Sequence, residues 1–328
     1  MTTFHTIVLP VRPQPDTIVA IFILKLFGRE RFPGVENASF AFWPKLPNEQ
    51  TAEQLEQTGH LLIDLGGGRF DHHNKDPKTT ASALVATELN AAANPSLTKL
   101  LAYAERDDFY GKGTISEDTI DRALGLSGLI AALNKSWPQH PEYVIAAVLP
   151  LIDGHWQEEN RRANEFPAEV ETQRRAGKVS ELTVKQRDKK LKVILLESDN
   201  VGLAGYLRSQ LGGRYDVVVQ KTAAGYVNIL TRPTKHIDLR GLAAIIRVKE
   251  ACSVGRTLSD NFRRLAIPGR LNEVPDWYYD TATNSLLNGG LLPTADIHPT
   301  RLSLSDLEII IPLGLTGQTF TSDSALSR

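Results

Sequence analysis

The chain has 328 residues, of which 41% are hydrophobic and 23% charged; this length allows two domains, and the composition is that of a globular rather than a fibrous or disordered protein. Its 37 Lys and Arg residues balance 38 Asp and Glu residues, so no overall basic field is available to bind duplex DNA without sequence preference. The single cysteine, Cys252, excludes an intramolecular disulfide and a cysteine-rich metal site.

The most apolar N-terminal segment, residues 17–27, is too short to span a bilayer and is interrupted by Lys25. Neither a basic segment nor a small-residue cleavage site accompanies it, so it does not resemble a signal peptide. We therefore expect a cytoplasmic protein without a membrane partner.

Strands and helices alternate along the first part of the chain. Residues 6–11 are apolar and β-branched and predict a strand, after which Asp16 is the expected N-cap of a helix at 17–27 that ends at Gly28. A strand, a helix and a strand are predicted next at 38–43, 52–58 and 61–65. This alternation predicts an α/β fold in which helices cover both faces of a parallel sheet.

Helical patterns follow at residues 80–135, with a break at 107–112, and at 141–152. Residues 157–190 are dense in Glu, Arg and Lys. Because both signs of charge are interspersed, a solvated connector helix is favoured over an RNA-binding arm. The predicted organisation is a first domain at 1–155 and a charged helical connector at 156–190.

A second domain is predicted at residues 191–328. Strands are predicted there at 192–196, 216–220 and 227–231, with a helix at 201–211 between the first two. The same alternation indicates a smaller α/β domain.

Acidic residues and histidines gather where the predicted strands of the first domain end. Asp16 and Asp64 follow strands, Asp71-His72-His73 comes shortly after three glycines, and Asp107-Asp108 lies in the predicted break between helices. Ligands of open α/β sheets bind beyond the carboxyl ends of the strands. Carboxylates with imidazole suit Mn²⁺, and two such ions about 3.5–4 Å apart can clamp a phosphoryl group, with Asp64 as the bridging ligand.

Each of these residues also has a structural interpretation. Asp16 can be a helix cap, Asp64 a turn former, and Asp107-Asp108 a solvated loop pair. A surface tripeptide is the alternative for Asp71-His72-His73, although adjacent histidines have no packing role that an apolar residue would not fill better. None of these residues alone distinguishes a metal site from its structural interpretation.

The ordered motifs resemble those of the DHH phosphoesterase superfamily. They are Asp16 after a strand, Leu-Ile-Asp64-Leu-Gly, Phe-Asp71-His72-His73, a Ser/Ala-rich helix at 79–86 and a later loop aspartate. The similarity covers residues 1 to about 150 and is greatest to the branch that contains the Myg-type RNA exonucleases. It implies metal-dependent hydrolysis of a phosphodiester or phosphoanhydride bond, as in exonucleases, cyclic-dinucleotide phosphodiesterases and one class of pyrophosphatase.

Carried over to this chain, the resemblance implies a set of metal ligands: Asp16, Asp64, His72 and either Asp107 or Asp108. It also implies that His73 faces the substrate phosphate and acts in catalysis together with Asp71. The cofactor would be one or two Mn²⁺ ions, with Mg²⁺ as the alternative. The partners would be a nucleotide or short oligonucleotide, with a homodimer as one open oligomeric state.

The first motif of this chain departs from the superfamily pattern. The superfamily has a histidine four residues before the first aspartate and an aspartate two residues after it, where this chain has Arg12 and Ile18. Arg12 can hold a phosphate but cannot activate water as a metal does. The departure leaves two hypotheses: an esterase that uses one ion and Arg12 as a catalytic cation, or a weakened relative that binds nucleotide or RNA without turnover.

The second domain would read the substrate. Asn288, Gly289 and Gly290, with Arg301 further on, can present backbone and side-chain donors to a phosphate. An Asn-Gly hairpin turn explains the glycines equally well. The aromatic run 277–279 can stack a base but is more typical of a core.

Overall fold

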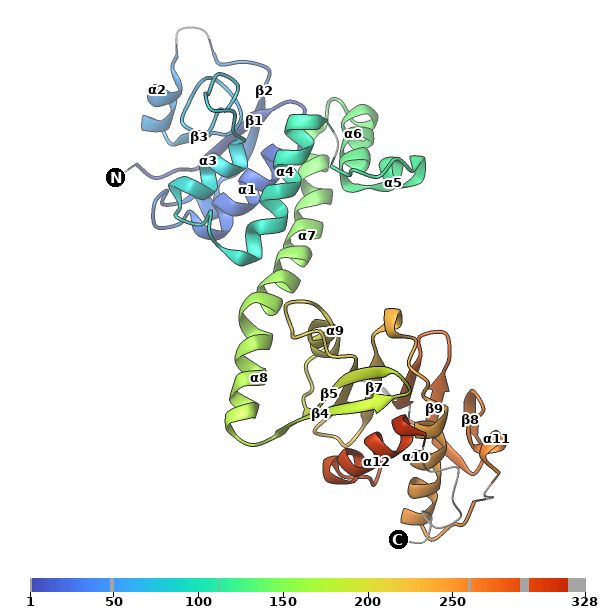
Figure 1. Ribbon diagram of the computed structural model, residues 1–328. Helices are drawn as coiled ribbons and strands as arrows, with labels where there is room; N and C mark the ends of the chain where they lie inside the picture. The colour runs from blue at the N-terminus through green and yellow to red at the C-terminus, as the bar shows by residue number, and fades with distance from the viewer. Residues whose placement is uncertain (1, 48–49, 112, 259–260, 290–294, 318–328) are drawn as a thin grey trace. The chain divides into compact units, whose positions relative to one another are not determined.

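The computed structural model describes residues 2–47, 50–111, 113–258, 261–289 and 295–317 (Figure 1). Contacts divide the chain into two compact units, Met1–Ala163 and Asn164–Arg328. The first unit ends shortly after the predicted boundary at residue 155. The second is as long as the first, so the expectation of a smaller second domain is wrong.

The first unit contains the predicted parallel sheet. It consists of β1 (Thr6–Pro10), β2 (Ser39–Trp43) and β3 (His60–Leu62), in the order β2-β1-β3 with every pairing parallel. The interior residues of β1 are fully buried, as expected for an apolar central strand that is covered on both faces. The α/β class predicted from the sequence is thereby confirmed.

Helices cover both faces of this sheet, because successive side chains of β1 point to opposite faces and enter different apolar cores. Ile7 and Leu9 join the large core that contains α1 (Pro15–Phe27), whereas Val8 on the opposite face packs with α2 (Ala52–Gln57). Three further helices pack against α1: α3 (Ala81–Glu88), α4 (Thr98–Tyr110) and α7 (Pro141–Asn160). This central position explains why α1 is apolar on nearly every side from Ile18 to Leu24.

Two local predictions for the first unit are wrong. Asp16 is not the N-cap of α1, because the helix begins at Pro15 with Gln14 as its N-cap; proline at the first helical position supplies the required φ. The predicted break at 107–112 is also wrong for residues 107–110, because α4 continues through Tyr110. Gly111, with φ 62°, is the C-cap of the helix.

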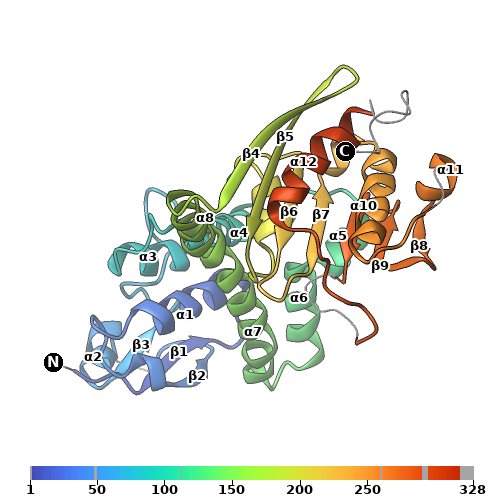
Figure 2. The same cartoon turned by 90° about the horizontal axis from the view of Figure 1, so that it is seen from below.

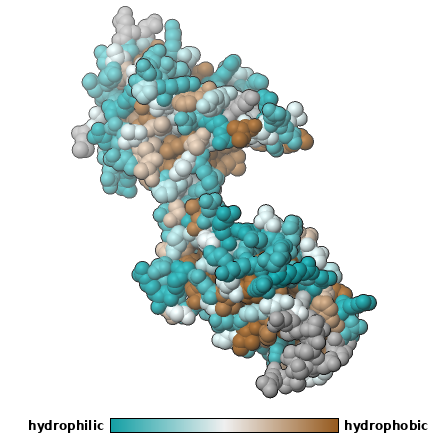
Figure 3. All heavy atoms as spheres, in the orientation of Figure 1, coloured by the Kyte–Doolittle hydropathy of each residue, from teal (hydrophilic) through white to brown (hydrophobic). Residues whose placement is uncertain are grey.

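Two short helices, α5 (Thr119–Leu124) and α6 (Leu126–Ser136), complete the first unit's helical layer. The buried side chain of Asn134 in α6 donates a hydrogen bond to the carbonyl of Pro13 (3.0 Å) and so ties α6 to the loop after β1. Several large hydrophobic side chains of α5 and α6, among them Ile120 and Leu124, are exposed on this part of the surface (Figure 3).

The second unit is built on a mixed seven-stranded sheet in the order β4-β5-β6-β7-β10-β9-β8, in which β5 and β6 are the parallel pair. Its strands are β4 (Val179–Gln186), β5 (Lys189–Glu197), β6 (Val217–Lys221), β7 (Val227–Thr231), β8 (Gly269–Leu271), β9 (Val274–Asp280) and β10 (Ser285–Asn288). Its helices are α8 (Phe166–Arg175), α9 (Leu203–Arg208), α10 (Arg240–Ser253), α11 (Phe262–Leu265) and α12 (Leu304–Thr316).

Separate apolar cores cover the two faces of the second sheet. Val193 and Leu195 of β5 pack with α10 and α12, which lie side by side (Figure 2), whereas Ile194 packs with α8 and α9 on the other face. Trp277 is buried in the first of these cores and donates to Glu250 (3.0 Å). It is therefore a core residue, in line with the structural interpretation of the aromatic run.

The prediction of a helical connector at 156–190 is wrong for its second half. Helical structure ends at Arg175, and β4 then pairs antiparallel with β5 within the sheet of the second unit. Leu182 and Val184 of β4 alternate with the exposed polar residues Glu181, Thr183 and Lys185. The charge of this strand concealed its period of two, which is the pattern of a strand with one solvated face. Of the described helices, none is both long and apolar enough to cross a membrane.

Candidate metal centre

Asp16 lies in the first turn of α1 but acts on another helix. Its side chain is 2% exposed, and its Oδ2 and Oδ1 atoms accept hydrogen bonds from the backbone N–H groups of Ala81 (2.7 Å) and Ser82 (2.9 Å). The pKa of Asp16 is raised, mainly by burial and further by the negative charge of Asp64. The hydrogen bonds from Ser82 and Ala81 lower this pKa but do not outweigh the burial. Asp16 is thus a buried acid that satisfies the N-terminus of α3.

Asp64 follows β3, where the chain leaves the sheet. Its φ of 59° is left-handed, a conformation that aspartate tolerates better than most residues. Oδ2 accepts a hydrogen bond from the buried Thr17 hydroxyl (2.7 Å). Oδ1 is buried and accepts no hydrogen bond of favourable geometry from the described residues, although Nε2 of His72 lies 3.0 Å away. A buried carboxylate oxygen in this position needs a cation beside it, either a protonated imidazole or a metal ion.

His72 lies among carboxylates that face both of its ring nitrogens. Nε2 is 3.0 Å from Oδ1 of Asp64 and 3.9 Å from Oδ2 of Asp16, whereas Nδ1 is 3.7 Å from Oδ2 of Asp108. The contact with Asp64 raises the pKa of His72 to about 9 despite burial, and the charges of Asp108 and Asp16 contribute. Without a metal ion, the imidazole therefore carries a proton at neutral pH.

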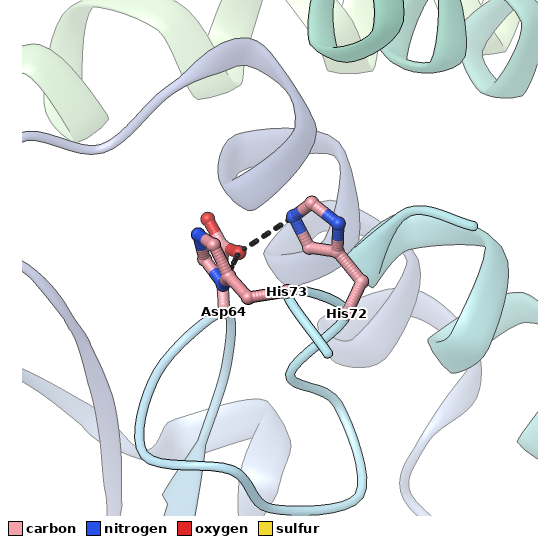
Figure 4. Close-up of side chains that lie close together, drawn as sticks. All are labelled: Asp64, His72 and His73. Carbon is pink, nitrogen blue, oxygen red and sulfur yellow. Dashed lines mark ion pairs between the residues drawn. The ribbon is translucent and has the colours of Figure 1, made fainter. Parts of the chain in front are cut away.

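His73 is held by Asp71 and stacks on His72. Its Nδ1 lies 2.7 Å from Oδ1 of Asp71 and 3.7 Å from Oδ1 of Asp64, and the two imidazole rings are 4.6 Å apart at 28° (Figure 4). Because the Asp71 carboxylate can only accept, the neutral His73 imidazole donates from Nδ1 and keeps its lone pair on Nε2. The His73 side chain is 62% exposed, so it is accessible to a ligand.

Asp71 organises the loop between Asp64 and the histidines. Its Oδ2 accepts from the backbone of Gly67 (2.7 Å), and its Oδ1 accepts from the backbone of His73 (3.1 Å). Burial alone would raise the pKa of Asp71, but these bonds and the His73 side chain lower it overall. Gly67 itself has φ 71°, which a residue with a side chain adopts only with strain.

The Asp107-Asp108 pair lies on the last turns of α4, not in a loop. Both residues line a cavity of about 440 Å³ that Asp16 also lines. Asp108 approaches Nδ1 of His72, the ring nitrogen opposite the one that faces Asp64. This places Asp108 where it can orient the His72 ring, whereas the structure records no contact between Asp107 and the histidines.

We refer to Asp16, Asp64, His72 and His73 as the Asp–His cluster. Ligands that bind one ion at about 2.0–2.3 Å are at most about 4.5 Å apart. Oδ1 of Asp64 and Oδ2 of Asp16 meet this limit with respect to Nε2 of His72. One ligand atom from each of Asp64, His72 and His73 lies within a slightly wider limit, 4.8 Å, of the other two. The donor set, two carboxylates and imidazole, therefore fits one divalent cation.

A second ion lacks the ligands that the superfamily pattern supplies. Ile18 is fully buried in the core of the first unit, and Arg12 is exposed, without a side-chain hydrogen bond or ion pair to any described residue. In addition, Thr17 occupies Oδ2 of Asp64, the oxygen that a bridging carboxylate would offer to another ion. The geometry of these residues provides for one ion.

The candidate residues of the second unit are largely used by its fold. Asn288 is fully buried; its amide donates to the carbonyls of Asp276 (3.1 Å) and His298 (3.0 Å) and accepts from the backbone of Thr300 (2.9 Å). It has no free donor for a phosphate. Gly289 follows with φ 74°, a left-handed conformation that favours glycine, but no described strand follows β10 to form the hairpin that was the alternative.

Two other candidates of the second unit differ from Asn288. Arg301 is exposed, and its guanidinium donates to the carbonyl of Ser253 (3.4 Å). Gly290 lies outside the described residues.

Thr17 is a site residue that sequence reasoning missed. The sequence signal for its role is its position next to Asp16, and a threonine there is equally typical of the start of a helix. Replacing it by valine keeps the shape but removes the donor to Asp64. We expect a loss of about 1–3 kcal/mol in the free energy of unfolding and a fall of about 10- to 100-fold in Mn²⁺ affinity.

Urea unfolding and calorimetric Mn²⁺ titration of Thr17→Val measure both quantities. Thr17→Ser is the control, because it retains the hydroxyl. Equal Mn²⁺ affinity of Thr17→Val and the parent would show that this hydrogen bond does not hold the ligand.

The affinity for Mn²⁺ should depend on pH through His72. A metal binds the neutral imidazole, and the raised pKa of about 9 keeps the metal-free imidazole protonated at neutral pH. We expect the apparent affinity to rise about tenfold per pH unit from about pH 6.5 to 8.5, with release of a proton on binding. Calorimetry in buffers of different ionisation enthalpy counts that proton; an affinity independent of pH would contradict the assignment.

No protein-family model and no curated protein matches this chain. Among solved structures, similarity is found to the crystal structure of an uncharacterized protein from Helicobacter pylori G27, with 11% identity over 96% of this chain and 99% of that chain and a TM-score of 0.24. A similarity of this extent supports no conclusion about fold or function. The resemblance to DHH phosphoesterases therefore remains an expectation from the sequence motifs.

Proposed function

We propose that the protein is a phosphoesterase dependent on one divalent ion, Mn²⁺ or alternatively Mg²⁺, and that it hydrolyses a phosphodiester or phosphoanhydride bond in a nucleotide or short oligonucleotide. The observation that carries the proposal is the convergence of potential ligand atoms from Asp64, His72 and His73 within 4.8 Å of one another, with the buried Oδ1 of Asp64 3.0 Å from Nε2 of His72. A buried carboxylate beside two imidazoles is a donor set that suits a divalent cation.

Three side chains of the Asp–His cluster would hold the ion, namely Asp16, Asp64 and His72. When bound, the ion would polarise the phosphate oxygens and make water more acidic. Asp108 would act through His72, because a carboxylate beside the second ring nitrogen of a ligating histidine fixes the orientation of the ring. Its distance of 3.7 Å from Nδ1 supports this role better than that of a ligand.

His73 would act on the substrate side. Asp71 holds Nδ1–H at 2.7 Å, so the lone pair of Nε2 is available on an exposed side chain. In this arrangement, Nε2 can accept a proton from the attacking water and return it to the leaving oxygen. Asp71 thereby fixes the tautomer of the base, in the way that a carboxylate orients a catalytic histidine.

The test is hydrolysis of a substrate panel by purified full-length protein with added Mn²⁺. The panel contains short RNA, 5′-phosphorylated diadenylate, cyclic dinucleotides and pyrophosphate. Release of product from at least one member, abolished by EDTA and restored by Mn²⁺, is the expected result. Absence of hydrolysis across the panel would overturn the proposal.

A second candidate function is nucleotide binding without turnover. Burial of Ile18 and exposure of Arg12 favour it, because both positions carry metal ligands in the superfamily pattern. Metal stoichiometry separates the two functions. One Mn²⁺ per chain together with hydrolysis supports the esterase, whereas nucleotide binding without Mn²⁺ supports the binding protein.

A further inference from the structure

The cavity that lies beside the Asp–His cluster is larger than the scissile phosphate requires. Its volume is about 440 Å³, within the range of cavities that enclose a small-molecule ligand. Asp16 and Asp108, which approach His72 at 3.9 and 3.7 Å, line one part of it, and Arg122 with the first turn of α6 lines another. The cavity thus connects the cluster with α5 and α6.

The two parts of the cavity differ in charge. Asp16, Asp107 and Asp108 supply negative charge on the cluster side, and Arg122 is the one basic side chain among the described residues of the lining. Arg122 is exposed, and no described carboxylate lies within ion-pair distance of its guanidinium. An unpaired guanidinium matches a phosphate group through paired N–H donors.

The wall formed by α6 is fixed with respect to the cluster, and α5, which carries Arg122, packs against α6. Asn134 at the end of α6 donates to the carbonyl of Pro13, next to the start of α1. Ser127 in the first turn of α6 is hydrogen-bonded to the hydroxyl of Tyr103 on α4 (2.7 Å). At Gly113, a side chain would collide with both of these residues. A rigid wall of this kind reduces the entropic cost of binding a ligand.

On the basis of the proposed phosphoesterase function, we infer that the cavity binds a second phosphate of the substrate and that Arg122 recognises it. The scissile phosphate lies at the Asp–His cluster, and the second phosphate extends the substrate toward α6. The preferred substrates are therefore nucleotides or short oligonucleotides that carry a phosphate in addition to the scissile one. Arg122 determines specificity and takes no part in bond cleavage.

The experiment measures binding, so that turnover does not interfere. The probes are a diadenylate with a non-hydrolysable methylenephosphonate linkage and the same compound with a 5′-phosphate. Both are titrated calorimetrically into Mn²⁺-loaded full-length parent, Arg122→Gln and Arg106→Gln. Arg106 is the matched control, because it lies on α4 beside Asp107 but does not line the cavity.

In the parent and in Arg106→Gln, the 5′-phosphate should tighten binding by about tenfold or more, as expected for a charge-assisted contact. In Arg122→Gln this advantage should disappear, with unchanged affinity for the unphosphorylated probe and for Mn²⁺. An equal 5′-phosphate advantage in Arg122→Gln, or none in the parent, would overturn the inference. Failure of the parent to bind Mn²⁺ would instead overturn the proposed function, so the two failures are distinguishable.

Discussion

Substitution of Asp64 by asparagine should lower the affinity for Mn²⁺ by about 100-fold or more and abolish Mn²⁺-dependent hydrolysis. The change retains the shape of the side chain and a residue type that tolerates the φ of 59°. It removes the charge of Oδ1, the buried atom that faces Nε2 of His72. Loss of a direct ligand should exceed the 10- to 100-fold effect that is typical of outer partners.

The measurement is a calorimetric Mn²⁺ titration, with thermal melts in EDTA to establish that the variant is folded. Asp118→Asn is the matched control: Asp118 caps α5 through a bond to the backbone of Ile120 (2.8 Å), and asparagine caps equally well. Binding of Mn²⁺ by Asp64→Asn as tightly as by the parent would refute the metal centre.

Substitution of His72 by glutamine should change both the affinity for Mn²⁺ and the stability of the metal-free protein. The affinity for Mn²⁺ should fall by about 100-fold and lose its dependence on pH, because the imidazole is the group that must be deprotonated. In metal-free protein, the raised pKa of His72 means that the folded state binds its proton more tightly than the unfolded state. The resulting stability is fully present below about pH 6.5 and is lost as the pH rises through about 9.

The side chain of His72 is 9% exposed, so the contribution to the free energy of unfolding is on the order of 3 kcal/mol at low pH. Urea unfolding in EDTA at about pH 6 and about pH 9.5 should therefore separate His72→Gln from the parent at the lower pH and bring them together at the higher one. His140→Gln, an exposed site paired with Glu142, is the control. A stability deficit that is the same at both pH values would assign His72 a packing role instead.

The sequence predicted the first sheet well because its elements carry strong local signals. Residues 6–11 and 38–43 are short apolar β-branched or aromatic runs, and the structure places β1 and β2 there. Asp64 and His72 could be brought together by reasoning, since a strand end and the loop that follows it share one edge of a parallel sheet. The structure places them 3.0 Å apart.

The rest depended on contacts between distant segments. The carboxylate of Asp16 receives its bonds from Ala81 and Ser82, more than sixty residues away, so its local pattern as a cap for its own helix was misleading. Thr17 and Arg122 carry no motif, and their roles follow from the position of Asp64 and from the cavity. In β4, charged residues on the solvent face concealed the strand period.

The most direct test of the metal centre is X-ray diffraction from crystals of the protein grown with Mn²⁺, with data collected at the manganese absorption edge. One anomalous peak per chain is expected at about 2.2 Å from both Oδ1 of Asp64 and Nε2 of His72, with Asp16 as a further ligand. A protein with its cluster intact and no anomalous peak at these atoms, or with its peak elsewhere in the chain, would contradict the assignment of this cluster as a metal centre.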